Sequence, residues 1–222
     1  MASKARSLEI GVIGAGVMGT ALSTRLLACG MKVVLVDCDS LALERARSEI
    51  ELQLRMLPFL NPTLGFEKEV DQVMWNLQLT QDLAKVRTCD GIVENIVERV
   101  AEKEALYRKL SEFLTVGTWV AVNTSCVPIR RLACLLPHPE RTVGLHLMNP
   151  VHQSRHAEMI RADLTSDRTV QDVQFFLEQL KLGHTQVRDR AGFVSNRILM
   201  LTVNEASKVI EEETASATQV DE

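Results

Sequence analysis

The chain has 222 residues, of which 46% are hydrophobic, and a formal net charge of −4. This length and apolar content predict a substantial core, built as one domain plus the start of another. The charge balance gives no indication of a nucleic-acid partner or an anionic membrane surface, and no stretch is apolar for long enough to span a bilayer.

The cysteines and residues 1–6 indicate the cellular compartment of the protein. The five cysteines are odd in number and form no C-x-x-C pair, which favours free thiols in a reducing compartment over a disulfide framework or a zinc site. Residues 1–6 are polar and lack the apolar core of a signal peptide. We therefore expect a cytoplasmic protein that holds no metal.

Short apolar segments alternate with longer amphipathic ones along most of the chain. This pattern is typical of an α/β fold with a doubly wound, mainly parallel sheet covered by helices. The expected strands are 8–13, 32–36, 90–94, 119–122 and 142–146. The expected helices are 17–29, 39–56, 66–75, 100–114, 127–135, 167–181 and 193–212. A last strand and a turn are expected between Gly183 and Asn196.

The opening segment carries a dinucleotide-binding fingerprint. An apolar run leads into Gly14-Ala-Gly16-Val-Met-Gly19, and a second β-branched run ends at Asp37. Gly14 permits the turn from strand to helix, Gly16 lets the backbone approach a pyrophosphate, and Gly19 lets the helix lie close to its strand. The carboxylate of Asp37 can accept hydrogen bonds from the adenosine ribose and would repel a 2′-phosphate. The pattern predicts NAD rather than NADP.

After the second strand, the sequence predicts a helical hairpin near residues 40–76. Pro58 and Pro62 are expected to break the second helix and to form the tip of the hairpin. Arg45 and Arg47 precede this tip. They could contact the phosphates of a bulky substrate, or they could simply solvate an exposed helix face.

Four polar clusters are candidates for chemistry, at residues 94–103, 123–128, 144–152 and 196–197. The first three follow expected parallel strands, and ligands bind at the carboxyl ends of such strands in open α/β sheets. Each candidate residue also has an ordinary structural explanation. His146 could be a core histidine, Ser125 a helix cap, and Glu98 and Lys103 a solvated ion pair. Glu158 could be an outward carboxylate on an edge strand, and Asn196 a helix N-terminal residue.

Taken together, these motifs resemble the 3-hydroxyacyl-CoA dehydrogenases. The matching segments are G-V-I-G-A-G-V-M-G at 11–19, V-E-N-I-V-E-R at 93–99, N-T-S at 123–125, G-L-H-L-M-N-P-V at 144–151 and G-F-V-S-N-R at 192–197. The resemblance implies a Rossmann-type fold and an oxidoreductase that transfers a hydride between NAD and the 3-hydroxyl carbon of a 3-hydroxyacyl thioester.

The resemblance also implies roles for individual residues. His146 would be the base that takes the 3-hydroxyl proton, Glu158 would orient its imidazole, and Ser125 and Asn196 would hold the oxygens of the substrate. The cofactor-binding residues that it implies are Gly14, Gly16, Gly19, Asp37, Glu98, Lys103, Ser125 and Asn149.

The chain departs from the usual family pattern in places. Leu147 and Met148 stand where two aromatic residues are usual, and Ala191 stands where a proline is frequent. We expect an NAD-binding Rossmann domain over residues 1–190, and over 191–222 the start of a helical C-terminal domain that is mostly absent. In the family that domain builds the dimer, so we expect a homodimer for the full-length form.

Two further alternatives concern the substrate and the activity. The acyl group could be carried by coenzyme A or by an acyl carrier protein, since residues 196–206 resemble relatives in polyketide pathways that oxidise a glyceryl carrier protein for extender units. A non-catalytic, NAD-binding protein similar to an eye-lens crystallin is the alternative from another class. The joint presence of His146, Glu158, Ser125 and Asn196 weighs against it.

Overall fold

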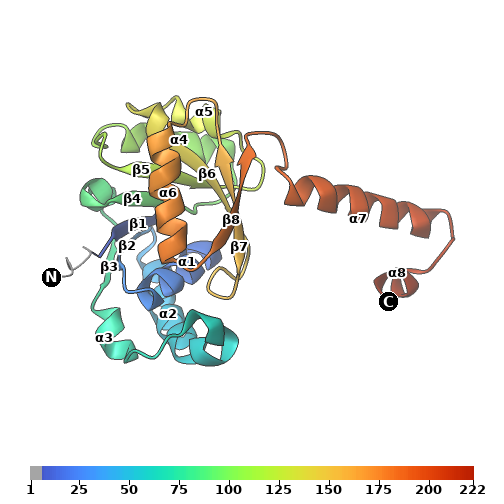
Figure 1. Cartoon of the computed structure of the whole chain (residues 1–222), viewed down its shortest axis with the longest axis horizontal. Helices are drawn as coiled ribbons and strands as arrows, with labels where there is room; N and C mark the ends of the chain where they lie inside the picture. The colour runs from blue at the N-terminus through green and yellow to red at the C-terminus, as the bar shows by residue number, and fades with distance from the viewer. Residues whose placement is uncertain (1–6) are drawn as a thin grey trace.

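The computed structural model describes residues 7–222, and the expectation about segment 1–6 lies outside the described residues. A single sheet with helices on both faces forms the body of the molecule (Figure 1). Its strands are β1 (Glu9–Ile13), β2 (Lys32–Val36), β3 (Leu77–Thr80), β4 (Gly91–Glu94), β5 (Trp119–Asn123), β6 (Thr142–Leu147), β7 (His156–Arg161) and β8 (Gly183–Arg188). The α-helices are α1 (Val17–Ala28), α2 (Ser40–Leu60), α3 (Val70–Met74), α4 (Val100–Leu110), α5 (Ile129–Ala133), α6 (Asp167–Gln179), α7 (Ser195–Glu211) and α8 (Ala217–Asp221).

The strands lie in the order β3-β2-β1-β4-β5-β6-β7-β8. Strands β1 to β6 are parallel, β7 pairs antiparallel with β6, and β8 pairs parallel with β7. The order reverses between β1 and β4, where doubly wound sheets bind ligands beyond the carboxyl ends of their strands. The prediction of a Rossmann-type, mainly parallel sheet is confirmed.

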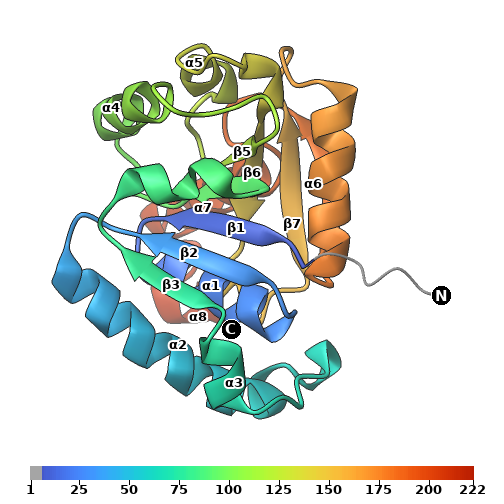
Figure 2. The ribbon, with the colours of Figure 1, turned by 90° about the vertical axis from the view of Figure 1, so that its left-hand side faces the viewer.

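Two apolar layers hold the helices on the sheet. Helices α1, α2, α3 and α6 cover one face through a core that contains Leu26, Ile50 and Phe176. Helices α4 and α5 cover the other face through residues such as Tyr107 and Leu132. Figure 2 shows α2 and α4 on opposite sides of β1, β2 and β3. Strands buried on both faces read as continuous apolar runs, and this made β1 and β2 recognisable.

Two strands differ from the sequence-based expectation. Strand β3 was not expected at all, and the strand around Glu158 was considered only as an edge strand with an outward carboxylate. That interpretation is wrong, because β7 lies between β6 and β8 and the side chain of Glu158 is buried. Burial of a carboxylate requires hydrogen-bond partners, and these define the candidate site below.

The expected break at Pro58 is also wrong, because α2 continues past it to Leu60. Pro58 has no N–H to donate to the carbonyl of Leu54, but Leu54 and Leu57 are fully buried in the core and hold the last turn in place. The chain then returns through a short 3-10 helix (Pro62–Leu64) to α3.

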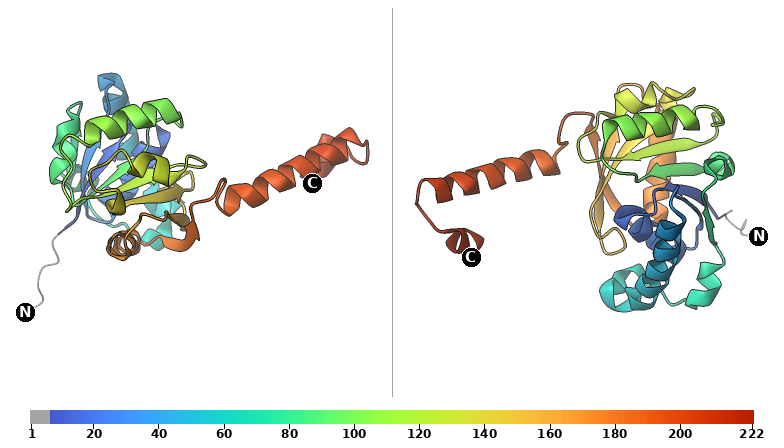
Figure 3. Two further views of the ribbon diagram at one scale, coloured as in Figure 1. Left: turned by 90° about the horizontal axis from the view of Figure 1, so that it is seen from above. Right: turned by 180° about the vertical axis from the view of Figure 1, so that it is seen from behind.

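Helices α7 and α8 project from the body of the molecule (Figures 1 and 3). The connection to α7 turns at Gly192, with φ 73°, and Phe193, with φ 48°, so two successive residues are left-handed. No residue of α7 is buried, and Ile198, Met200 and Leu201 are largely exposed. Within the described part of the chain, none of the helices has both the length and the apolarity that crossing a membrane requires.

Candidate active site

The glycine-rich turn after β1 has the geometry that a dinucleotide needs. Gly14 has φ 101°, a left-handed conformation that favours glycine. A Cβ on Gly19 would overlap the carbonyl oxygen of Gly14, so helix and strand approach closely only because this residue is glycine. A Cβ on Gly16 would meet open space at the N-terminus of α1, where backbone N–H groups favour a phosphate. These residues therefore fit the pyrophosphate of NAD.

Asp37 lies directly after β2, beside this turn. Its Oδ2 accepts a hydrogen bond from the backbone N–H of Ala15 at 2.7 Å, and its Oδ1 accepts one from the N–H of Asp39 at 2.9 Å. A carboxylate oxygen has two lone pairs, so each oxygen of Asp37 retains one acceptor site. Asp37 is thus held against the glycine turn and can still accept hydrogen bonds from a ribose.

His146 and Glu158 are brought together by the antiparallel pairing of β6 and β7. The two residues are direct partners in the register, and Nδ1 of His146 lies 2.8 Å from Oε2 of Glu158. An ionised carboxylate can only accept hydrogen bonds, so Nδ1 carries a proton, and in the neutral imidazole Nε2 is left as an acceptor. Nε2 lies 3.3 Å from Oγ of Ser125, two residues after β5.

A cavity of about 430 Å³ opens beside this chain of hydrogen bonds. It lies at the carboxyl ends of β4, β5 and β6, and the predicted residues in its wall are Glu98, Ser125, His146, Asn149 and Asn196. Asn196 comes from the first turn of α7, and its Nδ2 lies 3.5 Å from the carbonyl oxygen of Ser125. The structure therefore gathers five predicted site residues from four separate segments, with Glu158 directly behind His146.

Lys103 lies behind the cavity wall. Its side chain is fully buried, and Nζ donates to both oxygens of Glu94 at 2.8 Å and to the carbonyl of Asn123 at 3.0 Å. Nζ also lies 3.3 Å from Oε2 of Glu98. The structure therefore shows Lys103 as a support for two carboxylates, and a direct cofactor contact from it stays a prediction. Glu98 precedes α4, so the expected solvated ion pair on neighbouring helical turns is wrong.

The two carboxylates held by Lys103 differ in proton affinity. Burial raises the pKa of Glu94 above its ordinary value, even though the charge and hydrogen bonds of Lys103 act in the opposite direction. Burial would also raise the pKa of Glu98, but the hydrogen bond from Thr124 and the charge of Lys103 outweigh it, so the pKa is lowered. Glu98 also accepts the backbone N–H of Ser125 at 2.8 Å, which fixes the loop that carries the serine.

Glu158 is held from behind by the start of α7. Its Oε1 accepts the backbone N–H groups of Val194 at 3.0 Å and Ser195 at 2.9 Å, and its Oε2 accepts the hydroxyl of Ser195 at 2.7 Å. Burial would raise the pKa of Glu158, but the hydrogen bonds from His146 and from α7 outweigh it and lower the pKa. Ser195 was not predicted as a site residue, because a serine at a helix start is too common to indicate a site.

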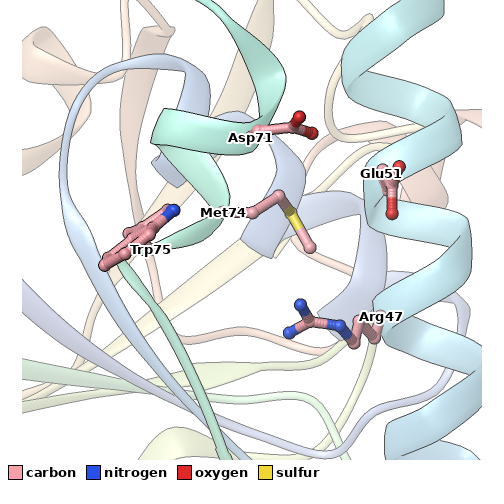
Figure 4. A pocket seen from close by; sticks show the side chains of 5 residues that line it. All are labelled: Arg47, Glu51, Asp71, Met74 and Trp75. Atoms are coloured by element: carbon pink, nitrogen blue, oxygen red, sulfur yellow. The ribbon is translucent and has the colours of Figure 1, made fainter.

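Arg45 and Arg47 face two other hollows. Arg45 lines a cavity of about 910 Å³ that includes Gly16 and Asn149, and its Nη2 pairs with Asp39 at 3.3 Å. Arg47 points into a separate hollow between α2 and α3, toward Met74 and the exposed Trp75 (Figure 4). The two arginines therefore do not form one phosphate site. Only Arg45 lies in a cavity that adjoins the glycine turn.

Comparison with known proteins identifies relatives of this chain. Residues 9–190 match the family model described as 3-hydroxyacyl-CoA dehydrogenase, NAD binding domain. A Deinococcus radiodurans protein named "Probable 3-hydroxybutyryl-CoA dehydrogenase" is 34% identical, over 96% of this chain and 76% of its own length. The mitochondrial hydroxyacyl-coenzyme A dehydrogenase of Sus scrofa is 31% identical, over 96% of this chain and 69% of its own length.

The crystal structure of a (S)-3-hydroxybutyryl-CoA dehydrogenase from Ralstonia eutropha superposes with a TM-score of 0.89 at 26% identity, covering 96% of this chain and 75% of that one. The family match spans the glycine turn, the cavity wall contributed by β4, β5 and β6, and the pair of His146 and Glu158. The chain therefore belongs to the 3-hydroxyacyl-CoA dehydrogenase family and is an NAD-binding oxidoreductase.

Proposed function

We propose that this protein interconverts 3-hydroxyacyl and 3-oxoacyl thioesters, with His146 as the group that takes and returns the hydroxyl proton. The observation that carries the proposal is the hydrogen-bonded series of Glu158, His146 and Ser125, which opens into one cavity with Asn149 and Asn196. This cavity lies at the point of the sheet where the glycine turn would hold a dinucleotide.

The proton step follows from the tautomer of His146. Nδ1–H donates to Glu158, so Nε2 presents a lone pair on the side of Ser125 and the cavity. A 3-hydroxyl group placed there transfers its proton to Nε2, and the imidazolium that forms is stabilised by the carboxylate of Glu158. The glycine turn and Asp37 would hold NAD, which would supply the acceptor for the hydride from the carbon that bears the hydroxyl. In the reverse direction the imidazolium returns its proton to the oxygen.

Ser125 and Asn196 are proposed to hold the reacting oxygen. Both are at least half-buried in the cavity wall, Ser125 in the loop after β5 and Asn196 in the first turn of α7. A hydroxyl and an amide N–H can each donate to an oxygen that gains negative character as the carbonyl forms or is reduced. Because the fold already holds these hydrogen-bond donors in place, they need to move little as the charge develops during the reaction.

The test is to mix the protein with NAD and 3-hydroxybutyryl-CoA and to follow the absorbance of the reduced cofactor. We expect turnover. Binding of NAD without turnover of any 3-hydroxyacyl thioester would contradict the proposal and support the crystallin-like alternative. A parallel reaction with a glyceryl-loaded acyl carrier protein determines whether the acyl carrier is coenzyme A or a protein.

The carrier-protein reading has one supporting observation, the exposed apolar end of α2. Phe59 is 80% exposed and Met56 is 44% exposed on this helix, which also contributes to the 910 Å³ cavity. An apolar surface beside a ligand cavity fits a protein-borne substrate better than a free one. Coenzyme A remains our first proposal, because it is the carrier in the names of the relatives.

All five cysteines are free, which supports the proposed cytoplasmic location.

Asp37 is proposed to select NAD over NADP, and Asp37→Asn is expected to weaken this selection by about tenfold or more. The carboxylate faces the ribose position, where a 2′-phosphate would meet a like charge. The measurement is the ratio of kcat/KM for the two cofactors. Asp82→Asn serves as a control, because Asp82 caps the 3-10 helix Leu83–Thr88 through the N–H of Ala84. A native preference for NADP would contradict the assignment.

We also propose that residues 191–222 begin a helical C-terminal domain, through which the full-length form pairs as a homodimer. The apolar residues Ile198, Leu201 and Val203 of α7 are at least half-exposed, and α7 touches little of the sheet domain (Figure 3). A large exposed apolar helix face tends to pack against another apolar surface, because this removes it from water. The 222-residue chain is therefore expected to self-associate in light-scattering measurements. A stable monomer with full activity would contradict this proposal.

A further inference from the structure

Ser195 touches both members of the proton-transfer pair from the side away from the cavity. Its hydroxyl donates to Oε2 of Glu158 at 2.7 Å, the same oxygen that accepts Nδ1–H of His146 at 2.8 Å. Its Oγ also lies 3.4 Å from Nδ1 of His146. The residues that line the 430 Å³ cavity do not include Ser195, so any effect on the reaction must act through Glu158 or His146.

We propose that Ser195 is a positioning residue that lowers the proton affinity of His146 by sharing Oε2 of Glu158. This inference rests on the proposed function, in which His146 carries the proton. An oxygen that accepts two hydrogen bonds offers each donor less negative charge than an oxygen that accepts one. Without the Ser195 hydroxyl, Oε2 accepts a hydrogen bond from Nδ1–H of His146 alone. The oxygen then carries more negative charge and stabilises the imidazolium form of His146 more strongly.

The position of Glu158 does not depend on the hydroxyl alone. Its Oε1 is fixed by the backbone N–H groups of Val194 and Ser195, and a substitution of the serine side chain leaves both in place. The ring of Phe193, 5.8 Å from the ring of His146, holds the imidazole from another side. Removal of the Ser195 hydroxyl therefore changes the charge on Oε2 but leaves Glu158 and His146 in contact.

Other titratable groups stand on the elements that surround the pair. They include Glu98 after β4, Arg197 of α7, His156 and Arg161 of β7, and His184 and Arg188 of β8. Glu98 accepts the backbone N–H of Ser125 and lines the same cavity as His146, and the ring of His156 bonds Thr185, the neighbour of Glu158 in β8. A substitution at Ser195 leaves all of these groups unchanged, so a shift in the titration of His146 reports the lost hydroxyl.

The decisive measurement is the NMR titration of the His146 ring, which needs neither substrate nor turnover. The resonance is assigned by its loss in His146→Gln. In Ser195→Ala, we expect the titration midpoint of this ring to move upward by about 0.5 pH unit. Ser195→Thr keeps a hydroxyl at the same position and is expected to restore the native midpoint.

A matched control is available in the same helix. Ser207→Ala removes a hydroxyl that bonds only the carbonyl of Val203 on the exposed side of α7, so the midpoint should stay in place. The pH profile of kcat/KM for hydroxyacyl oxidation should shift upward in Ser195→Ala by the same amount as the ring. An unmoved midpoint in Ser195→Ala, or a shift that threonine does not reverse, overturns the inference. An inactive native protein contradicts the proposed function, while the ring titration still decides the role of Ser195.

Discussion

Replacing His146 with alanine is expected to lower kcat for hydroxyacyl oxidation by about a thousandfold, the range that loss of a general base produces. Without Nε2, the 3-hydroxyl proton has no acceptor placed beside Ser125. The affinity for NADH should change little, because the glycine turn lies between β1 and α1 and Asp37 directly follows β2, away from the imidazole. The measurements are initial rates with 3-hydroxybutyryl-CoA and a fluorescence titration with NADH.

His156→Ala is the matched control for this prediction. His156 lies at the start of β7, two residues before Glu158, and its ring bonds the hydroxyl of Thr185 on the surface. We expect native rates from this variant. Turnover by His146→Ala within tenfold of the native rate would remove His146 from the role of base, whatever the family of the chain.

The nucleotide half of the site could be predicted from sequence because its parts are local. Gly14, Gly16 and Gly19 act on one turn, and Asp37 ends the next strand, so their spacing along the chain fixes their positions in space. The catalytic half is different. His146 and Glu158 meet only because of the register between β6 and β7, and no spacing rule predicts antiparallel pairing at the end of a parallel sheet. Their pairing was expected from the family resemblance alone.

Burial was the property that sequence reasoning predicted least well. A lysine in the first turns of a helix is ordinarily solvated, yet Lys103 is fully buried because Glu94, Glu98 and the carbonyl of Asn123 surround it. Helix α8 was missed for a different reason. Its segment is polar, but Ser216 and Gln219 form a capping box, a local signal that was readable in the sequence.

The structure suggests that Lys103 links the sheet to the catalytic loops. Through Glu94 it holds the end of β4, through Asn123 the end of β5, and through Glu98 the loop that carries Ser125. These contacts converge on a single ammonium group. Removing its charge would therefore affect the stability of the fold and the placement of Ser125 at the same time.

Lys103→Met is expected to lower the free energy of unfolding by about 3–5 kcal/mol, because it leaves Glu94 buried without its counter-charge. The double variant Glu94→Gln, Lys103→Met removes both charges and should recover most of this loss. Lys109→Met, on the exposed side of α4, should change stability by less than about 0.5 kcal/mol. Urea unfolding followed by circular dichroism at pH 7 measures all three variants.

The pH dependence of Lys103→Met gives a second, independent test. The pKa of Glu94 is already raised in the native protein by burial, and loss of the lysine should raise it further. A carboxyl group with a higher pKa in the folded state binds more protons when folded, so its contribution to stability falls as the pH rises above the unfolded pKa. The stability deficit of Lys103→Met should therefore shrink as the pH is lowered from 8 toward about 5.5. A deficit that stays constant over this range would show that Glu94 is not the group left uncompensated.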